Sequence, residues 1–246
     1  MLIRDFTLNR LIYFENFCIQ YQPVEMKTSL VIFILSSLSR TSNLATLHCD
    51  YETIWAAWNN LKQEETYGCT GTIVYQEEKN YITSVSQNHI GTRSPNDVKM
   101  LIYKKGQIIP KLLKFTDNFY PELESFAAVD VSLEVITGED FINFPKTLRI
   151  IYLYKNKLKE IPSNLFKYTP NLDSIALDRN KIEHVGNNFF KYLNLEKLKR
   201  FGIKSNTCTD FQYIENGEKN LFESLRVELL NKCKPTHKMI VNDGLI

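Results

Sequence analysis

Tyrosine and charged side chains recur at a fixed spacing in the middle of this 246-residue chain. Tyr152 and Tyr154 stand two residues apart, and Asp178 and Arg179 follow Tyr154 and Lys155 after 24 residues. A tyrosine ring has a rigid apolar body and a polar tip, and arginine and lysine make charge-assisted hydrogen bonds. Because groups of this kind dominate the energetics of protein interfaces, the chemistry they indicate is recognition of a protein or peptide.

Catalytic chemistry has little support in the sequence. The chain has no G-x-S-x-G, no H-E-x-x-H and no glycine-rich phosphate loop. Its four histidines are scattered along the chain, and no C-x-x-C is present. We therefore predict a protein that is not an enzyme, with no catalytic residues, no metal site and no cofactor.

The elements that would position the tyrosines follow from an apolar repeat. Between Leu148 and Asn171 the apolar residues follow the intervals L-x-x-L-x-L-x-x-N-x-L, with Asn156 in the asparagine position. The same intervals restart at Leu172, with Asn180 in that position. Alternating apolar residues predict one short strand per copy, and the repetition predicts that the strands stack side by side. This is the pattern of leucine-rich repeats.

Three weaker copies keep the apolar positions of this pattern. Those positions hold Val98, Leu101, Tyr103 and Ile108 in the first copy, Leu123, Phe126, Ala128, Leu133, Ile136 and Phe141 in the second, and Leu198, Phe201, Ile203 and Cys208 in the last. Asn206 keeps the asparagine of the last copy, whereas Gly106 and Val131 replace it in the first two. We therefore predict an α/β-type solenoid, a leucine-rich repeat horseshoe of about five turns over residues 98–206 with a parallel concave sheet.

The outward positions of the stacked strands form columns on the concave face. The three columns read Ile102, Ala127, Tyr152, Ala176, Gly202; Lys104, Val129, Tyr154, Asp178, Lys204; and Lys105, Asp130, Lys155, Arg179, Ser205. The predicted ligand-binding set is Ile102, Lys104, Tyr152, Tyr154, Lys155, Asp178, Arg179 and Lys204. The alternative is a merely solvated strand face, in which the small residues of the first column reflect tight curvature.

The N-terminal residues have the layout of a leader. After Met26, a lysine is followed by an apolar run that reaches Leu38, and a small, polar segment ends near Ala45. This is the layout of a secretory signal peptide, and the apolar run is too short to span a bilayer. We predict that residues 1–45 are removed from a secreted protein with no membrane span; a buried helix at 26–40 is the alternative.

Four cysteines remain after this leader, and an even number predicts disulfides in a secreted protein. Of the three possible pairings, their positions favour Cys49–Cys69 just before the array and Cys208–Cys233 just after it, so that each bridge closes one end of the solenoid.

Each end of the array needs a cover, because no single copy can bury its own apolar face. We assign residues 46–97 to an N-terminal cap, in which Thr70–Val85 suits a hairpin with its turn at 77–80. Residues 207–234 form a C-terminal cap, with an amphipathic helix that carries its last cysteine back to its first. Residues 235–246 are a short, polar tail.

From Cys49 to Cys233 the chain resembles the secreted leucine-rich repeat proteins of insects. These pair a small cysteine-bearing N-terminal module with a short repeat array and a C-terminal cysteine cap. Besides the two strong repeats, the residues that carry the resemblance are Leu47, Cys49, Tyr51 and Trp55, the Tyr67-Gly68-Cys69 ending and the stretch PNDVKMLIY at 95–103. The resemblance implies extracellular protein recognition.

The charge balance narrows the class of partner that the protein can bind. Thirty basic and 28 acidic residues leave a net charge of +2, which argues against a broad attraction to nucleic acid. The main hypothesis is a secreted module that binds an extracellular protein or peptide ligand through its concave face. The alternative is a structural component of the extracellular matrix that associates with itself, and the oligomeric state is left open.

Overall fold

The computed structural model describes residues 45–55, 65–74, 81–211, 214–215 and 219–242. They belong to one compact unit, Asn43–Ile246. The predicted leader lies outside the described residues except for Ala45, which begins the first strand and is fully buried.

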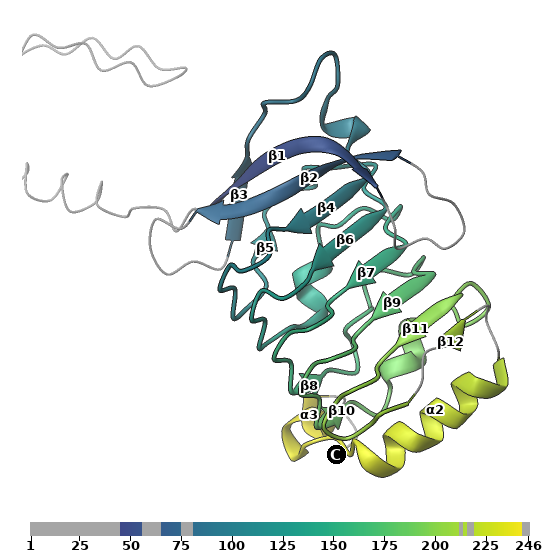
Figure 1. Ribbon diagram of the computed structural model, residues 1–246. Helices are drawn as coiled ribbons and strands as arrows, with labels where there is room; N and C mark the ends of the chain where they lie inside the picture. The colour runs from purple at the N-terminus through teal and green to yellow at the C-terminus, as the bar shows by residue number, and fades with distance from the viewer. Residues whose placement is uncertain (1–44, 56–64, 75–80, 212–213, 216–218, 243–246) are drawn as a thin grey trace, which may run out of the picture. The chain divides into compact units, whose positions relative to one another are not determined.

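Five short parallel strands stack side by side in the middle of this unit (Figure 1). Turns one to five of the solenoid take their strands in the order β4 (Met100–Tyr103), β6 (Ser125–Ala128), β7 (Ile150–Tyr152), β9 (Ser174–Ala176) and β11 (Arg200–Gly202). One row of paired residues faces the core: Leu101, Phe126, Ile151, Ile175 and Phe201. The predicted register of all five turns, and with it the leucine-rich repeat solenoid, is confirmed.

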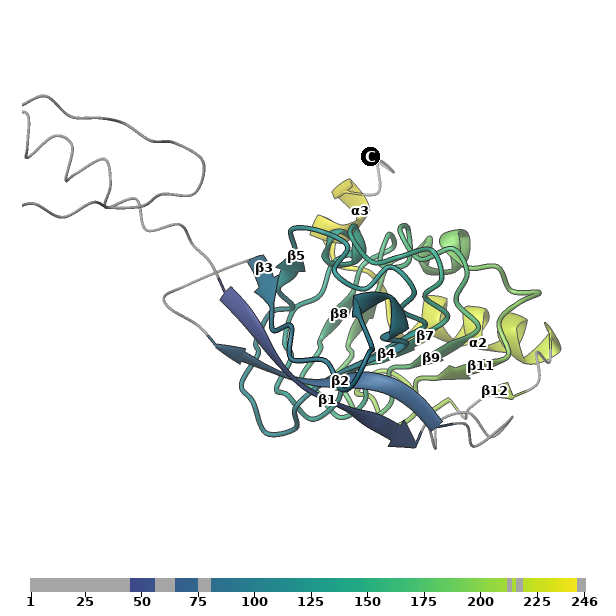
Figure 2. The same cartoon turned by 90° about the horizontal axis from the view of Figure 1, so that it is seen from above.

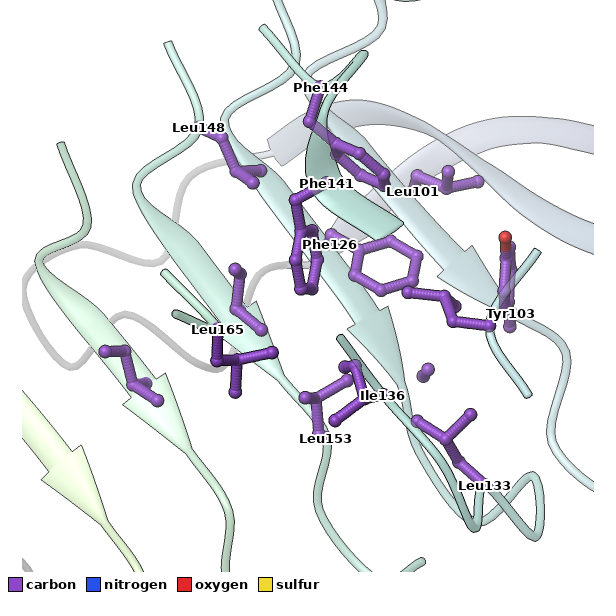
Figure 3. Close-up of a cluster of buried hydrophobic side chains, with 14 of the residues drawn as sticks. Leu101, Tyr103, Phe126, Leu133, Ile136, Phe141, Phe144, Leu148, Leu153 and Leu165 are labelled. Carbon is purple, nitrogen blue, oxygen red and sulfur yellow. The ribbon is translucent and has the colours of Figure 1, made fainter. Parts of the chain in front are cut away.

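Aromatic rings fill the core behind the first three strands. The centroid of the Phe126 ring lies 5.2 Å from that of Tyr103, 5.1 Å from that of Phe144 and 6.2 Å from that of Phe141. Figure 3 shows these rings between the strands and the segment that returns behind them. The rings meet edge to face, the arrangement that their charge distribution favours.

The chain returns behind the strands through short elements. In turns two to four these are the 3-10 helices η2 (Gly138–Phe141) and η3 (Phe189–Tyr192), and the parallel pair of strands β8 (Glu160–Ile161) and β10 (His184–Val185). A further 3-10 helix, η1 (Pro95–Asp97), lies in the connector before β4.

The N-terminal cap continues the sheet around the end of the core. Strand β1 (Ala45–Trp55) pairs with β2 (Glu65–Val74) on one edge and with β3 (Tyr81–Val85) on the other. Beyond them, β2 pairs with β4 of turn one, and β3 pairs with β5 (Lys114–Phe115), as Figure 2 shows from another side.

The predicted hairpin over Thr70–Val85 is wrong. Strand β2 already has β1 and β4 on its two edges, so β3 has no edge of β2 to pair with and joins β1 instead. The true hairpin is β1 with β2, and the Cys49–Cys69 disulfide joins its two strands as predicted. The predicted turn at 77–80 lies outside the described residues.

The C-terminal cap closes the other end of the array. Strand β12 (Ile214–Glu215) pairs with β11, and helix α2 (Lys219–Lys232) buries Phe222, Leu225 and Leu229 against the core. The Cys208–Cys233 disulfide follows α2, so both predicted pairings are confirmed.

The tail after this disulfide differs from the prediction. Instead of a polar extension it contains a short helix, α3 (His237–Asn242), in which Met239 is 7% exposed. The burial of Met239 places this part of the tail against the solenoid.

A buried asparagine holds the chain where it leaves the strand of turn three. Asn156 Nδ2 donates to the Ala128 carbonyl at 2.7 Å, and its Oδ1 accepts from the Val131 and Leu133 N–H groups at 3.1 Å each. All three partners belong to turn two. The side chain therefore satisfies backbone groups that have no strand partner.

Asn180 and Asn206 make equivalent bonds in turns four and five. Each side chain donates to carbonyls of its own turn and of the turn before it, and each accepts from an N–H of the turn before. The three asparagines thus form a ladder along turns three to five.

Turn one uses a glutamine for the same purpose. Gln107 Oε1 accepts from the Ile73 N–H at 2.8 Å, and Nε2 donates to the Gly71 carbonyl at 2.9 Å. Both partners lie on β2, so Gln107 ties the first turn to the N-terminal cap.

Turn one is also one residue longer than predicted between its strand and the Gln107 side chain. Gly106, at a φ of 86°, takes the left-handed conformation that Lys155 takes directly before Asn156, and glycine adopts it at little cost. The extra residue therefore lies between Tyr103 and Gly106. As a result, Ile108 is 75% exposed and Ile109 is buried in its place. The assignment of Ile108 to the core was therefore wrong by one position.

Candidate functional site

The concave face is the surface of β4, β6, β7, β9 and β11 that points away from the phenylalanine core. Apolar residues from four of these strands and the residue after β6 meet on it in a second cluster, the concave cluster: Ile102, Ala127, Val129, Ile150, Tyr152 and Ala176. Strand pairing places Ile102, Ala127, Tyr152 and Ala176 in one row, as the first predicted column requires.

The sequence analysis missed Ile150 as part of this cluster. Ile150 precedes the core-facing Ile151, so strand alternation points it to the concave face, where it is 8% exposed. Strand alternation alone predicts that Ile150 faces the concave side, because its neighbour Ile151 faces the core.

Tyr152 lies on the concave face but does not project from it. The residue is only 5% exposed, and its hydroxyl lies 3.3 Å from Ser174 Oγ on the neighbouring strand. Burial raises the pKa of this phenol. Since Ala127 and Ala176 flank Tyr152 on the two adjoining strands, there is space for the ring to lie along the sheet, where it forms the floor of the face.

Tyr154 is the more accessible of the two tyrosines. It is half-buried, and the guanidinium of Arg179 lies 5.5 Å from the centroid of its ring. This is cation–π distance, and it joins turns three and four at the border of the concave cluster.

Lys155 belongs to a row of alternating charges. Its Nζ donates to Asp130 Oδ2 at 3.0 Å, and Lys105 Nζ lies 3.6 Å from the same oxygen. This row follows the predicted third column across turns one to three. The hydrogen bond from Lys155 lowers the pKa of Asp130.

Asp178 is held by the turn that follows it. Its Oδ1 accepts from the Lys204 N–H at 2.8 Å, and its carboxylate lies over Gly202, where any side chain would overlap with it. Burial raises the pKa of this carboxyl, against the opposing effect of the hydrogen bond from Lys204.

The remaining predicted residues lie at the two ends of these rows. Lys104 and Lys204 are exposed beside turns one and five, and Ile102 is half-buried at the start of the apolar row. The structure therefore places two of the eight predicted residues, Ile102 and Tyr152, on strands of the concave face, and the other six within three residues after a strand.

A second row of charges, which the sequence analysis did not identify, borders the beginning of the strands. Lys99 lies 3.5 Å from Glu124, and the Arg149 Nε donates to Asp173 at 3.0 Å. Each of these residues precedes a strand of turns one to four, so the repeat itself could have predicted the row.

The polar groups of the face suit binding. They are lysine, arginine, carboxylate and phenol side chains that mostly bond to one another. Over the ranges that the structure describes, no cluster of histidine, cysteine, aspartate and glutamate could hold a metal ion. In the same ranges, no helix has the length and apolar character needed to cross a membrane.

Comparison with known proteins identifies the repeats. Residues 146–206 match the family model described as leucine rich repeat. These 61 residues contain the three asparagines of the ladder. The search of curated proteins found no match for the chain.

One similar solved structure is that of the Toll–Spatzle complex, described as a molecular hub in Drosophila development and innate immunity. A chain of that structure has 16% sequence identity and a TM-score of 0.37, and the match covers 51% of the present chain and 17% of that chain. The family match and the asparagine ladder together show that residues 146–206 carry leucine-rich repeats, within a solenoid of five turns.

Proposed function

We propose that this protein is an extracellular, non-enzymatic module that binds a protein or peptide ligand on its concave face. One observation carries the proposal: Ile102 and Val129 are partly exposed over the buried remainder of a compact apolar cluster on the concave face, and paired charges lie beside it. An apolar centre with a polar rim is the usual composition of a protein-binding surface.

Tyr154 and Arg179 are the residues that we expect to contact the ligand most directly. Both border the concave cluster, and their side chains already stack on each other, so little conformational entropy is lost when a ligand orders them. Tyr152 supports the site from below because it is buried. Ile102 supplies the accessible end of the apolar row.

The location outside the cell is supported by the two disulfides, Cys49–Cys69 and Cys208–Cys233. Structural disulfides persist in oxidising compartments and are rare in the cytosol. The signal-peptide layout of the predicted leader points the same way.

The test is capture of partners from the extracellular fluid of the source organism with the wild type and two variants. Ile102→Glu places a charge at the edge of the concave cluster, and Tyr154→Ala removes the stacked ring. Ile142→Glu is the matched control, because Ile142 is 48% exposed behind η2, away from the concave face. A partner that the wild type and the control retain and both concave variants lose supports the proposal. Equal retention by all four proteins contradicts it.

Self-association is the alternative function that the sequence left open. The two ends of the sheet offer few unpaired backbone groups for it. The edge strands β5 and β12 have two residues each, which offers few backbone groups for pairing with another copy. Light scattering at high protein concentration tests this point, and a monomer is the expected result.

A further inference from the structure

A hollow of about 680 Å³ lies beside the solenoid, on the side to which the chain turns after the asparagine ladder. We call it the side hollow. It lies between the returning segments of turns two to four and helix α3, and its volume is within the usual range for ligand sites. It shares no lining residue with the concave cluster.

Basic side chains outnumber acidic ones around the side hollow, with four lysines and two glutamates in its lining. Lys157 lies 3.7 Å from Glu134, but Lys159, Lys181 and Lys238 have no acidic partner within 4.0 Å among the described residues. Lys157 and Lys181 follow Asn156 and Asn180 directly, so they stack at equivalent positions of adjacent turns. An acidic ligand in the side hollow therefore meets positive charge from two neighbouring turns.

The floor of the hollow is apolar. Val135 is 51% exposed although it lies in the middle of the array, and Ile136, Pro162 and Met239 line the hollow with it. Met239 is contributed by α3, so the tail helix completes the hollow that the repeats begin.

We propose that the side hollow binds an acidic peptide segment of a partner protein, one that carries an apolar side chain between carboxylates. The unpartnered lysines select negative charge, and the exposed valine selects an apolar group in the same ligand. A sulfated polysaccharide fits less well, because it has charge for the lysines and nothing to cover the apolar floor. This site is separate from the concave face and does not depend on the function proposed there.

The proposal is tested by NMR titration of the full chain with the blocked peptide acetyl-Asp-Glu-Leu-Asp-Glu-amide. Signals of Lys157, Lys181 and Met239 are expected to shift. The double variant Lys181→Glu with Lys238→Glu should bind this peptide roughly tenfold more weakly or worse, since attractive charge pairs become repulsive. A matched control, Lys167→Glu with Lys191→Glu, makes the same change of net charge on exposed lysines outside the hollow and should bind as the wild type does.

Two further probes separate the sources of binding. Replacing the leucine of the peptide by glycine should weaken binding at least several-fold, and heparin should not compete at matched ionic strength. The proposal is overturned if the double variant and the control bind the peptide equally. It is also overturned if the glycine peptide binds as well as the leucine peptide, or if heparin binds the hollow and the peptide does not.

Discussion

The first two turns and the last three share one strand register. They differ in the groups that hydrogen-bond to the backbone where the chain leaves each strand. Each of the last three turns contributes a buried asparagine to the ladder, whereas turn one uses Gln107 and turn two has the buried Val131. In turn two the backbone takes over, since the Val131 carbonyl accepts from the Ile109 N–H at 2.8 Å. The strand register is therefore set by the row of core-facing side chains. The groups that hydrogen-bond to the backbone of each turn can vary.

This difference also explains the extent of the family match. The match covers residues 146–206, which hold the three asparagine-bearing turns, while the two turns before it have the same fold with other residues. The concave cluster takes Ile102, Ala127 and Val129 from those first two turns. The proposed binding face thus depends on the part of the array in which the sequence pattern is weakest.

The largest expected effect comes from removing the asparagine that joins the two regions. Asn156→Ala leaves the Val131 and Leu133 N–H groups of turn two buried without an acceptor. We expect the free energy of unfolding to fall by about 3 kcal/mol, measured by urea denaturation. Asn171→Ala is the control, because this side chain bonds at the surface, and about 0.5 kcal/mol is expected for it. Equal losses in the two variants would show that the ladder does not carry this stability.

A smaller effect is expected where turn five fits against turn four. Gly202→Ala places a methyl group where the Asp178 carboxylate lies, so the hydrogen bond from the Lys204 N–H is lost. The expected loss is about 2 kcal/mol. In an Asp178→Ala background the same change should cost far less, because the carboxylate that it displaces is absent. Additive losses in this double-mutant cycle would contradict the packing described here.

Turn one should be less sensitive than turn three to loss of its amide. Gln107→Ala removes the bonds to Ile73 and Gly71, but Gln107 is only half-buried, so water can replace part of them. We expect a loss of about 1 kcal/mol by urea denaturation. A loss as large as that for Asn156→Ala would mean that the glutamine and the asparagine are equivalent.

The smallest expected effects are opposite pH dependences in the two regions. The pKa of Asp178 is raised in the folded protein, so above about pH 4 the folded state binds more protons than the unfolded state. The contribution of Asp178 to stability therefore falls as pH rises from about 4 through its folded pKa. The pKa of Asp130 is lowered, so its contribution is present above about pH 4 and is lost as pH falls through its folded pKa.

Urea denaturation between pH 2 and 7 measures both slopes as differences between the wild type and Asp178→Asn or Asp130→Asn. A slope of the same sign for both residues would rule out the assigned surroundings of one of them.

The sequence predicted the strand stack and both disulfides because apolar periodicity and cysteine position are local signals. It did not predict that Tyr152 is buried, since this depends on having Ala127 and Ala176 on both neighbouring strands. The shift between Ile108 and Ile109 depends on one extra residue before Gly106, which spacing alone does not locate.

The capping elements were the least predictable for a related reason. The partner of β3 is decided by which strand edges remain free, and a short sequence window does not contain that information. Helix α3 has only six residues, fewer than the window over which apolar periodicity indicates a helix.

Native-state hydrogen exchange tests most directly whether the five turns form one continuous face. The paired amides of β4 and β6 should exchange with opening free energies within about 1 kcal/mol of those of β7 and β9. If β4 and β6 open several kcal/mol more easily while β7 and β9 stay protected, the first two turns are a separate, weaker unit, and a concave face that includes Ile102 and Ala127 is contradicted.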